Sequence, residues 1–357
     1  MRKHYLDNIR WVTVVLVVIY HVFYMYNGEG VLGGLGKITS LNIQYYDLFM
    51  NIVYPWLMPI LFIVSGIASR LYLEKHTDRE FIRSRTLKLL VPSTIGLFVF
   101  QFVQGYISMS LSNAFETLKE VPSFIKYLIM TLSGSGVLWY CHMVWLFSVM
   151  LILIRKAEKD RGWKLCSKVN LWVLLLLTPV IWLSSHSGNV PVVTVYRFGL
   201  YSMMFFLGYF IFSHDEVIEM LKKYFVLFLS LALVLCVAFC IYSFPKNYAD
   251  APINLSILFI AYGWMGCLSI LGGFAKYFDF ENKFTQWMNR HSFGLYVFHY
   301  LGISAVALYL ARPGLLNPVL VYVISLIAGF ASGYVLWEII SRLPFFRWAV
   351  LGTKRKG

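Results

Sequence analysis

The chain has 357 residues, of which 59% are hydrophobic, 18% aromatic and only 13% charged, with a mean hydropathy of +0.68. Soluble domains carry about 25% charged residues, so this composition excludes a water-soluble surface and makes membrane lipid the outer solvent. The net charge of +14 is explained by basic loops that face anionic lipid headgroups, and we expect no nucleic-acid partner.

Ten apolar runs follow one another along the chain, and most approach the ~20 residues that a membrane-spanning helix needs. They cover residues 9–26, 49–72, 87–109, 137–154, 170–185, 194–213, 223–243, 252–273, 291–311 and 316–341. The fifth run is short and contains Pro179, and the sixth contains Arg197, so nine or eleven spans also fit. The sequence predicts an all-α, polytopic membrane bundle of about ten transmembrane helices.

The basic residues give this bundle an orientation. With ten spans, 25 of the 31 Lys and Arg residues fall on the side that carries the N-terminus. Because Lys and Arg accumulate in cytoplasmic loops, both termini are predicted to face the cytoplasm, in a multi-pass protein of the plasma membrane. One membrane domain is expected over 1–343, with a short basic cytoplasmic tail over 344–357. The stretches between spans, such as 27–46 and 110–136, are read as loops too short for an independent domain.

The first candidate site is a helical stripe that carries Arg10 and His21. Eleven residues at about 100° each end roughly 20° past three full turns, so both side chains share one face about 16 Å apart. Asp7, three residues before Arg10, can pair with the guanidinium at the membrane boundary. The functional interpretation is a polar path into the bundle. The structural alternative is an interface anchor at Arg10 and an interhelix hydrogen bond at His21.

Two further groups lie on other helices. Arg85 and Lys88, three residues apart at the cytoplasmic entry to the third span, project from one side of a helix end. There they would hold the phosphates of an anionic co-substrate, or simply anchor the helix. Ser292, Tyr296 and His299 share one face of the ninth span, and His299 lies about 13 Å deep. The two imidazoles are therefore predicted to approach one another, although interhelical packing would explain His299 as well.

The remaining candidates favour structural roles. These scattered polar or aromatic residues are Gln101, Gln104, Trp139, His142, Arg197 and Glu338. The intramembrane Glu and Gln residues are candidates to line a cavity, whereas Trp139 fits the aromatic belt at the membrane interface. The five cysteines lack metal-ligand or redox spacing, so we expect no metal site and no disulfide framework. The sequence indicates no oligomeric state.

In their order along the chain, several segments resemble the membrane acyltransferase-3 family of bacterial O-acyltransferases, which includes glucan-modifying succinyltransferases. The resemblance covers nearly the whole chain and lies in Leu6-Asp7-Asn8-Ile9-Arg10 followed by His21, in Met58 to Gly66, in Arg85-x-x-Lys88 before Leu-Leu-Val-Pro, in Leu138-Trp139-Tyr140, in Phe206 to Tyr209 and in Ser292 to His299. The family's ten-helix layout with both ends inside agrees with the count of basic residues.

The resemblance implies transfer of an acetyl- or succinyl-class acyl group from cytoplasmic acyl-coenzyme A to a hydroxyl of a cell-envelope or exported carbohydrate or glycolipid. Acyl-coenzyme A is then a co-substrate, and no tightly bound cofactor is expected. By carry-over, Arg10 and His21 occupy the family's Arg-x10-His positions, and the paired basic motif falls on Arg85 and Lys88. A lysine stands where the second basic residue is often arginine, which weakens bidentate recognition of phosphate.

A mechanism follows from these positions as a hypothesis. Arg85 and Lys88, with Arg10, bind the coenzyme A phosphates, while the thioester reaches His21, which acts as general base or transient acyl acceptor. Tyr296 is expected to stabilise the oxyanion, and His299 to serve the acceptor hydroxyl. The alternative is a multi-pass transporter or flippase whose polar residues line a substrate path. The ten spans with polar residues at mid-depth favour that alternative, and the missing internal repeat argues against it.

Overall fold

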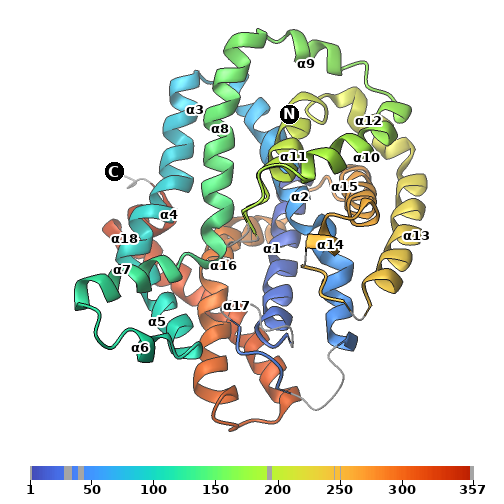
Figure 1. Ribbon diagram of the computed structural model, residues 1–357. Helices are drawn as coiled ribbons and strands as arrows, with labels where there is room; N and C mark the ends of the chain where they lie inside the picture. The colour runs from blue at the N-terminus through green and yellow to red at the C-terminus, as the bar shows by residue number, and fades with distance from the viewer. Residues whose placement is uncertain are drawn as a thin grey trace. The chain divides into compact units, whose positions relative to one another are not determined.

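A computed structural model describes residues 2–27, 34–38, 44–190, 195–244, 246–249 and 251–353 (Figure 1). Throughout these residues the regular structure is helical, with one isolated β-bridge between Asn189 and Arg197. The prediction of an all-α polytopic bundle is confirmed. The elements are α1 (His4–Met25), α2 (Gln44–Leu73), α3 (Asp78–Arg85), η1 (Thr86–Leu90), α4 (Val91–Gly96), η2 (Leu97–Gln101), α5 (Phe102–Leu111), α6 (Ala114–Thr117), α7 (Ser123–Ser133), η3 (Gly136–Leu138), α8 (Trp139–Glu158), α9 (Arg161–Cys166), α10 (Leu171–Ser185), α11 (Phe198–Phe210), α12 (Asp215–Lys223), α13 (Phe225–Ser243), α14 (Ala251–Asn254), α15 (Ile257–Tyr277), α16 (Lys283–Val306), η4 (Ala307–Ala311), α17 (Pro318–Arg342) and α18 (Pro344–Leu351).

Eight helical runs in the described part of the chain are long and apolar enough to cross a membrane, by length and composition. They coincide with eight of the ten predicted spans. The other two predicted spans are the shorter helices α10 and α11, of 15 and 13 residues. A 15-residue helix is about 22 Å long, less than the ~30 Å hydrocarbon core of a bilayer. The ten predicted spans are therefore eight long helical runs and two short helices.

The third predicted span is an irregular helical run from Asp78 to Leu111. It contains two π-helical segments, η1 and η2, in which the backbone is wider than in an α-helix. Pro92 is the second residue of α4, which begins directly after η1. Because Pro92 has no N–H to donate to the carbonyl of Lys88, and its ring crowds that carbonyl, an ordinary α-helical turn cannot form there.

The segment 110–136 is not only a loop, and this prediction was wrong. It contains α7, an apolar helix that lies beside α5 (Figure 1). A Cβ atom on Gly105 would lie 1.7 Å from the carbonyl oxygen of Met130, and one on Gly134 would lie 2.0 Å from that of Gln101. Small residues at such a crossing allow two helix backbones to touch.

The segment 344–357, predicted as a tail, begins with the helix α18. This helix packs on α4 and buries Ala349, Val350 and Leu351. A Cβ atom on Gly96 of α4 would lie 2.8 Å from the carbonyl oxygen of Ala349. Residues 354–357, which carry the basic end of the predicted tail, lie outside the described residues.

The chain divides into two compact units. Unit 1 comprises residues 1–13, 51–83 and 143–289, and unit 2 comprises residues 14–50, 84–142 and 290–357. In unit 1, α2 and α11 touch backbone to backbone at Gly66 and Gly208. In unit 2, a buried apolar cluster that includes Val18, Phe298 and Ile303 surrounds the inner faces of α1 and α16. The residues predicted to take part in catalysis or donor binding belong to unit 2, except Arg10 in unit 1, and the scattered candidate Arg197 also belongs to unit 1.

Candidate active site

Two histidines from distant parts of the sequence meet inside unit 2. His21 lies on α1 and His299 on α16, 278 residues apart along the chain. Nε2 of His299 lies 3.1 Å from Nδ1 of His21, and the ring centroids are 4.9 Å apart. The predicted approach of the two imidazoles is confirmed.

The hydrogen-bond partners of the pair define where its protons are. Nδ1 of His299 lies 2.9 Å from the carbonyl oxygen of Leu295 and 3.0 Å from that of Tyr296. A carbonyl oxygen only accepts, so this nitrogen carries the proton and, in the neutral ring, Nε2 of His299 has a lone pair. Nδ1 of His21 faces that lone pair and the carbonyl oxygen of Val17 at 2.8 Å, so it also carries a proton. The lone pair of a neutral His21 is therefore on Nε2.

The two rings differ in exposure. The side chain of His299 is fully buried, with an exposed fraction of 0%, whereas His21 is partly exposed. The rings of Tyr20, Tyr24 and Tyr300 lie edge-on to the His21 ring, with centroids 5.2 to 5.9 Å away. His299 is thus enclosed with both nitrogens engaged, whereas the His21 residue keeps part of its surface accessible.

Tyr296 lies one turn before His299 on α16, and its hydroxyl donates to the backbone carbonyl of Val137 in η3. The residue is buried. This bond ties α16 to the beginning of α8. In this structure the proton that the sequence analysis assigned to an oxyanion is therefore directed at a backbone oxygen.

A second polar contact lies beyond the histidine pair on α16. Gln104 of α5 donates to Ser304 at 3.1 Å, and Ser304 donates to the carbonyl oxygen of Tyr300 at 2.7 Å. Both Gln104 and Ser304 are buried. Sequence reasoning missed Tyr300 and Ser304. Both are polar residues in the same predicted span as His299, one and five residues after it, and this position could have marked them as candidates.

Arg10 is paired as expected. Its Nη1 lies 2.9 Å from Oδ1 of Asp7, three residues earlier on α1. Asp7 also accepts from Arg2 at 2.8 Å, and this hydrogen bond raises the pKa of the Arg2 guanidinium above its usual value. Arg10 and His21 lie on the same continuous helix, so the predicted stripe is present, with one of its ends in each unit.

Arg85 and Lys88 lie on either side of a change in helix type. Arg85 ends α3 and is half-buried, whereas Lys88 lies within η1 and is exposed. The α-helical spacing that the sequence analysis assumed for this pair does not apply, because η1 is π-helical. A Cβ atom on Gly352, just after α18, would lie 2.3 Å from the carbonyl oxygen of Leu87 and 2.8 Å from Cα of Lys88. Gly352 therefore packs directly against the backbone at Leu87 and Lys88.

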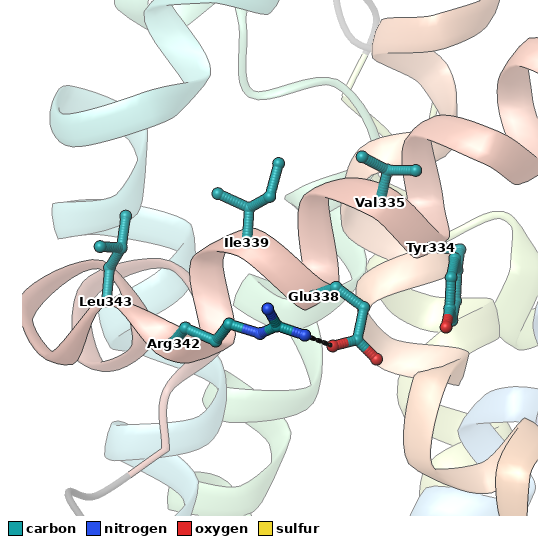
Figure 2. Close-up of a pocket in the computed structure, with 6 residues that line it drawn as sticks. All are labelled: Tyr334, Val335, Glu338, Ile339, Arg342 and Leu343. Carbon is teal, nitrogen blue, oxygen red and sulfur yellow. Dashed lines mark hydrogen bonds and ion pairs between the residues drawn. The ribbon is translucent and has the colours of Figure 1, made fainter.

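Glu338 lines a hollow of about 350 Å³ on α17, and Figure 2 shows its carboxylate paired with Arg342. The distance between Nη2 of Arg342 and Oε2 of Glu338 is 3.2 Å. The buried His291, which sequence reasoning did not single out, lies on the other side, with Nε2 3.5 Å from Oε1 of Glu338. The other residues that line the hollow are mostly apolar. This hollow does not include the histidine pair.

Two of the other scattered residues, His142 and Arg197, make interhelix contacts. Nε2 of His142 lies 2.6 Å from the carbonyl oxygen of Ser93, and Arg197 donates to the carbonyl oxygen of Asn254 at 2.8 Å. Among the described residues, no group of three or more His, Cys, Asp or Glu side chains is arranged to hold a metal ion.

Comparison with known proteins bears on the chain as a whole. No curated protein matches it, and no solved structure matches it. A family model described as an acyltransferase domain matches residues 3–338, nearly the full length. This match includes all the helices that carry the histidine pair and the paired basic residues. The chain therefore belongs to the acyltransferase-3 family and is a multi-pass membrane acyltransferase.

Proposed function

We propose that this acyltransferase moves an acetyl- or succinyl-class acyl group from cytoplasmic acyl-coenzyme A to a hydroxyl of a cell-envelope or exported carbohydrate. The proposal places it in the plasma membrane with both termini in the cytoplasm, as the distribution of Lys and Arg favours. Family membership supports acyl transfer. The contact between His21 and His299 carries the assignment of the reacting group, because it leaves an accessible ring with a lone pair on Nε2.

In the proposed reaction His21 is the general base. Its Nε2 takes the proton from the acceptor hydroxyl as the hydroxyl oxygen attacks the thioester carbonyl. The C–S bond then breaks, and the departing thiolate takes a proton from His21 to leave as free coenzyme A. The same Nε2 is also the atom that would carry the acyl group if transfer passed through an acyl-imidazole. If the protein becomes labelled when it is incubated with acyl-labelled coenzyme A in the absence of acceptor, transfer passes through the acyl-imidazole.

His299 acts in this proposal as a positioning residue. Its Nε2 accepts the Nδ1–H of His21 together with the carbonyl oxygen of Val17, which fixes the ring orientation and leaves the lone pair of His21 on Nε2. Once His21 takes a proton, the same hydrogen bond stabilises the resulting imidazolium. The sequence analysis gave His299 a direct contact with the acceptor hydroxyl. The complete burial of its ring favours the indirect role instead.

The donor is proposed to bind through its phosphates. Arg85 and Lys88 supply two cationic groups near the junction of α3 and η1. Arg10, near the N-terminal end of α1, stays a predicted donor-binding residue. Guanidinium and ammonium groups form charge-assisted hydrogen bonds with phosphate. These residues are expected to govern affinity for acyl-coenzyme A rather than the rate of the chemical step.

The test is acyl transfer in proteoliposomes by His21→Ala. Loss of a general base lowers kcat by about a hundredfold to ten-thousandfold. His186→Ala is the matched control, because His186 is exposed and its Nδ1 contacts only the carbonyl oxygen of Trp182 among the described residues. Full activity in a correctly inserted His21→Ala protein would overturn the proposed mechanism.

A further inference from the structure

A second cationic site lies in unit 1, apart from the residues proposed for acyl transfer. It is a hollow of about 250 Å³ lined by Asp78 at the start of α3, by Arg155 and Lys156 of α8, and by Lys159 and Asp160 directly after α8. We refer to it as the α8 hollow. None of its residues belongs to the sequence motifs that point to the acyltransferase reaction.

The carboxylates of the α8 hollow are already neutralised. Asp78 accepts from Arg155 at 2.6 Å, and Asp160 accepts at 2.7 Å from Arg70 of α2, which also pairs with Glu74 at 3.3 Å. Lys156 and Lys159 form no ion pair with any residue that the structure describes. Two ammonium groups thus face a shared hollow without a counter-charge of their own, and this arrangement favours an anionic ligand.

The backbone at this site is held in an unusual conformation. Lys159 and Asp160 are consecutive non-glycine residues in the left-handed region, with φ of 51° and 58°. Such residues persist where the surrounding structure fixes them, and they are found at functional sites. Arg70 holds the Asp160 side chain in place at this turn. Its guanidinium bonds Asp160 and lies 3.8 Å from the ring centroid of Trp163 in α9. The turn between α8 and α9 (Figure 1) is therefore built to hold Lys159 and Asp160 at the hollow.

The location of the α8 hollow indicates the source of the anion. The membrane-spanning run that contains α8 ends at Glu158, so the hollow lies where lipid phosphates meet the protein. Two exposed apolar side chains precede the hollow on α8: Met150 is 38% exposed and Leu153 is 65% exposed. We propose that the α8 hollow binds the phosphate of an anionic membrane lipid through Lys156 and Lys159, with an acyl chain along Met150 and Leu153.

The proposal is tested by lipid binding to the full-length protein in detergent. Phosphatidylglycerol is titrated against phosphatidylcholine, and bound lipid is counted by native mass spectrometry. Each lysine near an anionic lipid contributes enough that Lys156→Gln/Lys159→Gln is expected to weaken phosphatidylglycerol binding by about tenfold or more. The matched control is Lys164→Gln/Lys168→Gln, which removes the same charge from exposed positions in and just after α9, outside the hollow.

Three outcomes separate the possibilities. An equal loss in Lys164→Gln/Lys168→Gln would show diffuse attraction to the whole basic surface and overturn a discrete site. Inorganic phosphate that competes as well as phosphatidylglycerol would assign the hollow to a soluble anion and overturn the lipid assignment. Leu153→Gln keeps the charges, and we expect it to weaken long-chain phosphatidylglycerol but not a short-chain form. Unchanged long-chain binding would reject the acyl-chain path. None of these results depends on acyl-transfer activity.

Discussion

The two units differ in where their buried Arg and His side chains lie along the helices. In unit 2, His299, Ser304 and Gln104 are buried within long helical runs, and all three π-helical segments of the described chain lie there. In unit 1, the buried cationic residues Arg70 and Arg197 lie at or near helix ends. Polar groups inside a span are costly and mark function, whereas those at helix ends anchor the fold. The comparison supports the proposal that the reacting histidine lies in unit 2 and that unit 1 provides packing and a lipid contact.

The largest expected effect tests the scaffold role of unit 1. In Gly66→Ala, the new Cβ atom would lie 2.0 Å from the carbonyl oxygen of Phe205 and 2.8 Å from the backbone nitrogen of Tyr209. Neither backbone atom can rotate away, so we expect unfolding to become about 3 kcal/mol more favourable. Thermal unfolding in detergent measures this. Gly162→Ala is the control, because its nearest neighbour is the flexible carboxylate of Glu158 at 3.2 Å. A Gly66→Ala protein with normal stability would contradict the close backbone packing.

The next prediction tests the positioning role of His299. His299→Phe keeps a ring of similar size but removes one of the two acceptors that face Nδ1–H of His21, and the carbonyl oxygen of Val17 remains. We expect kcat to fall by about tenfold to a hundredfold, because a misplaced catalytic group costs that much, while KM for acyl-coenzyme A is unchanged. His299→Gln offers an amide oxygen to His21 and should restore part of the rate. Steady-state kinetics in proteoliposomes distinguishes the variants. A full rate in His299→Phe would reduce the pair to a packing contact.

A smaller effect is expected at the paired basic residues. Arg85→Gln or Lys88→Gln removes a charge-assisted hydrogen bond to phosphate, which should raise KM for acyl-coenzyme A by about tenfold. The value of kcat at saturation should stay the same. Arg83→Gln provides the control, because Arg83 is exposed on the same helix, two residues before Arg85. If all three variants raise KM equally, the basic residues act only through general surface charge.

The smallest expected effect concerns the contact of Gly352 with the backbone at Leu87 and Lys88. Gly352→Ala would place Cβ 2.3 Å from the carbonyl oxygen of Leu87, so the backbone that carries Lys88 must shift. A displacement of this kind should raise KM for acyl-coenzyme A by about threefold. Gly314→Ala is a close control, because Gly314 has a φ of +73° against +60° for Gly352 but no atom within 4 Å. An equal change in both variants would attribute the effect to backbone strain alone.

Local spacing made several features predictable. The Asp7–Arg10 pair follows from three residues of helix, and it is present at 2.9 Å. The shared depth of His21 and His299 follows from counting residues into two spans, and the contact at 3.1 Å confirms it. The relative positions of Arg85 and Lys88 could not be predicted from regular α-helical spacing. The backbone at Lys88 is π-helical, because Pro92 cannot donate a hydrogen bond to the carbonyl of Lys88.

The amino-acid sequence by itself determined that this protein is helical, lies in a membrane and carries its apolar runs where the helices are found, because each of these properties depends on residues close together in the chain. Only the tertiary structure decided which nitrogen of His21 carries the lone pair, that α7 lies beside α5, that Gly352 packs against the backbone at Lys88 and that Lys156 and Lys159 share a hollow with paired carboxylates. Each of these depends on contacts between segments distant in the sequence, which helical periodicity does not encode.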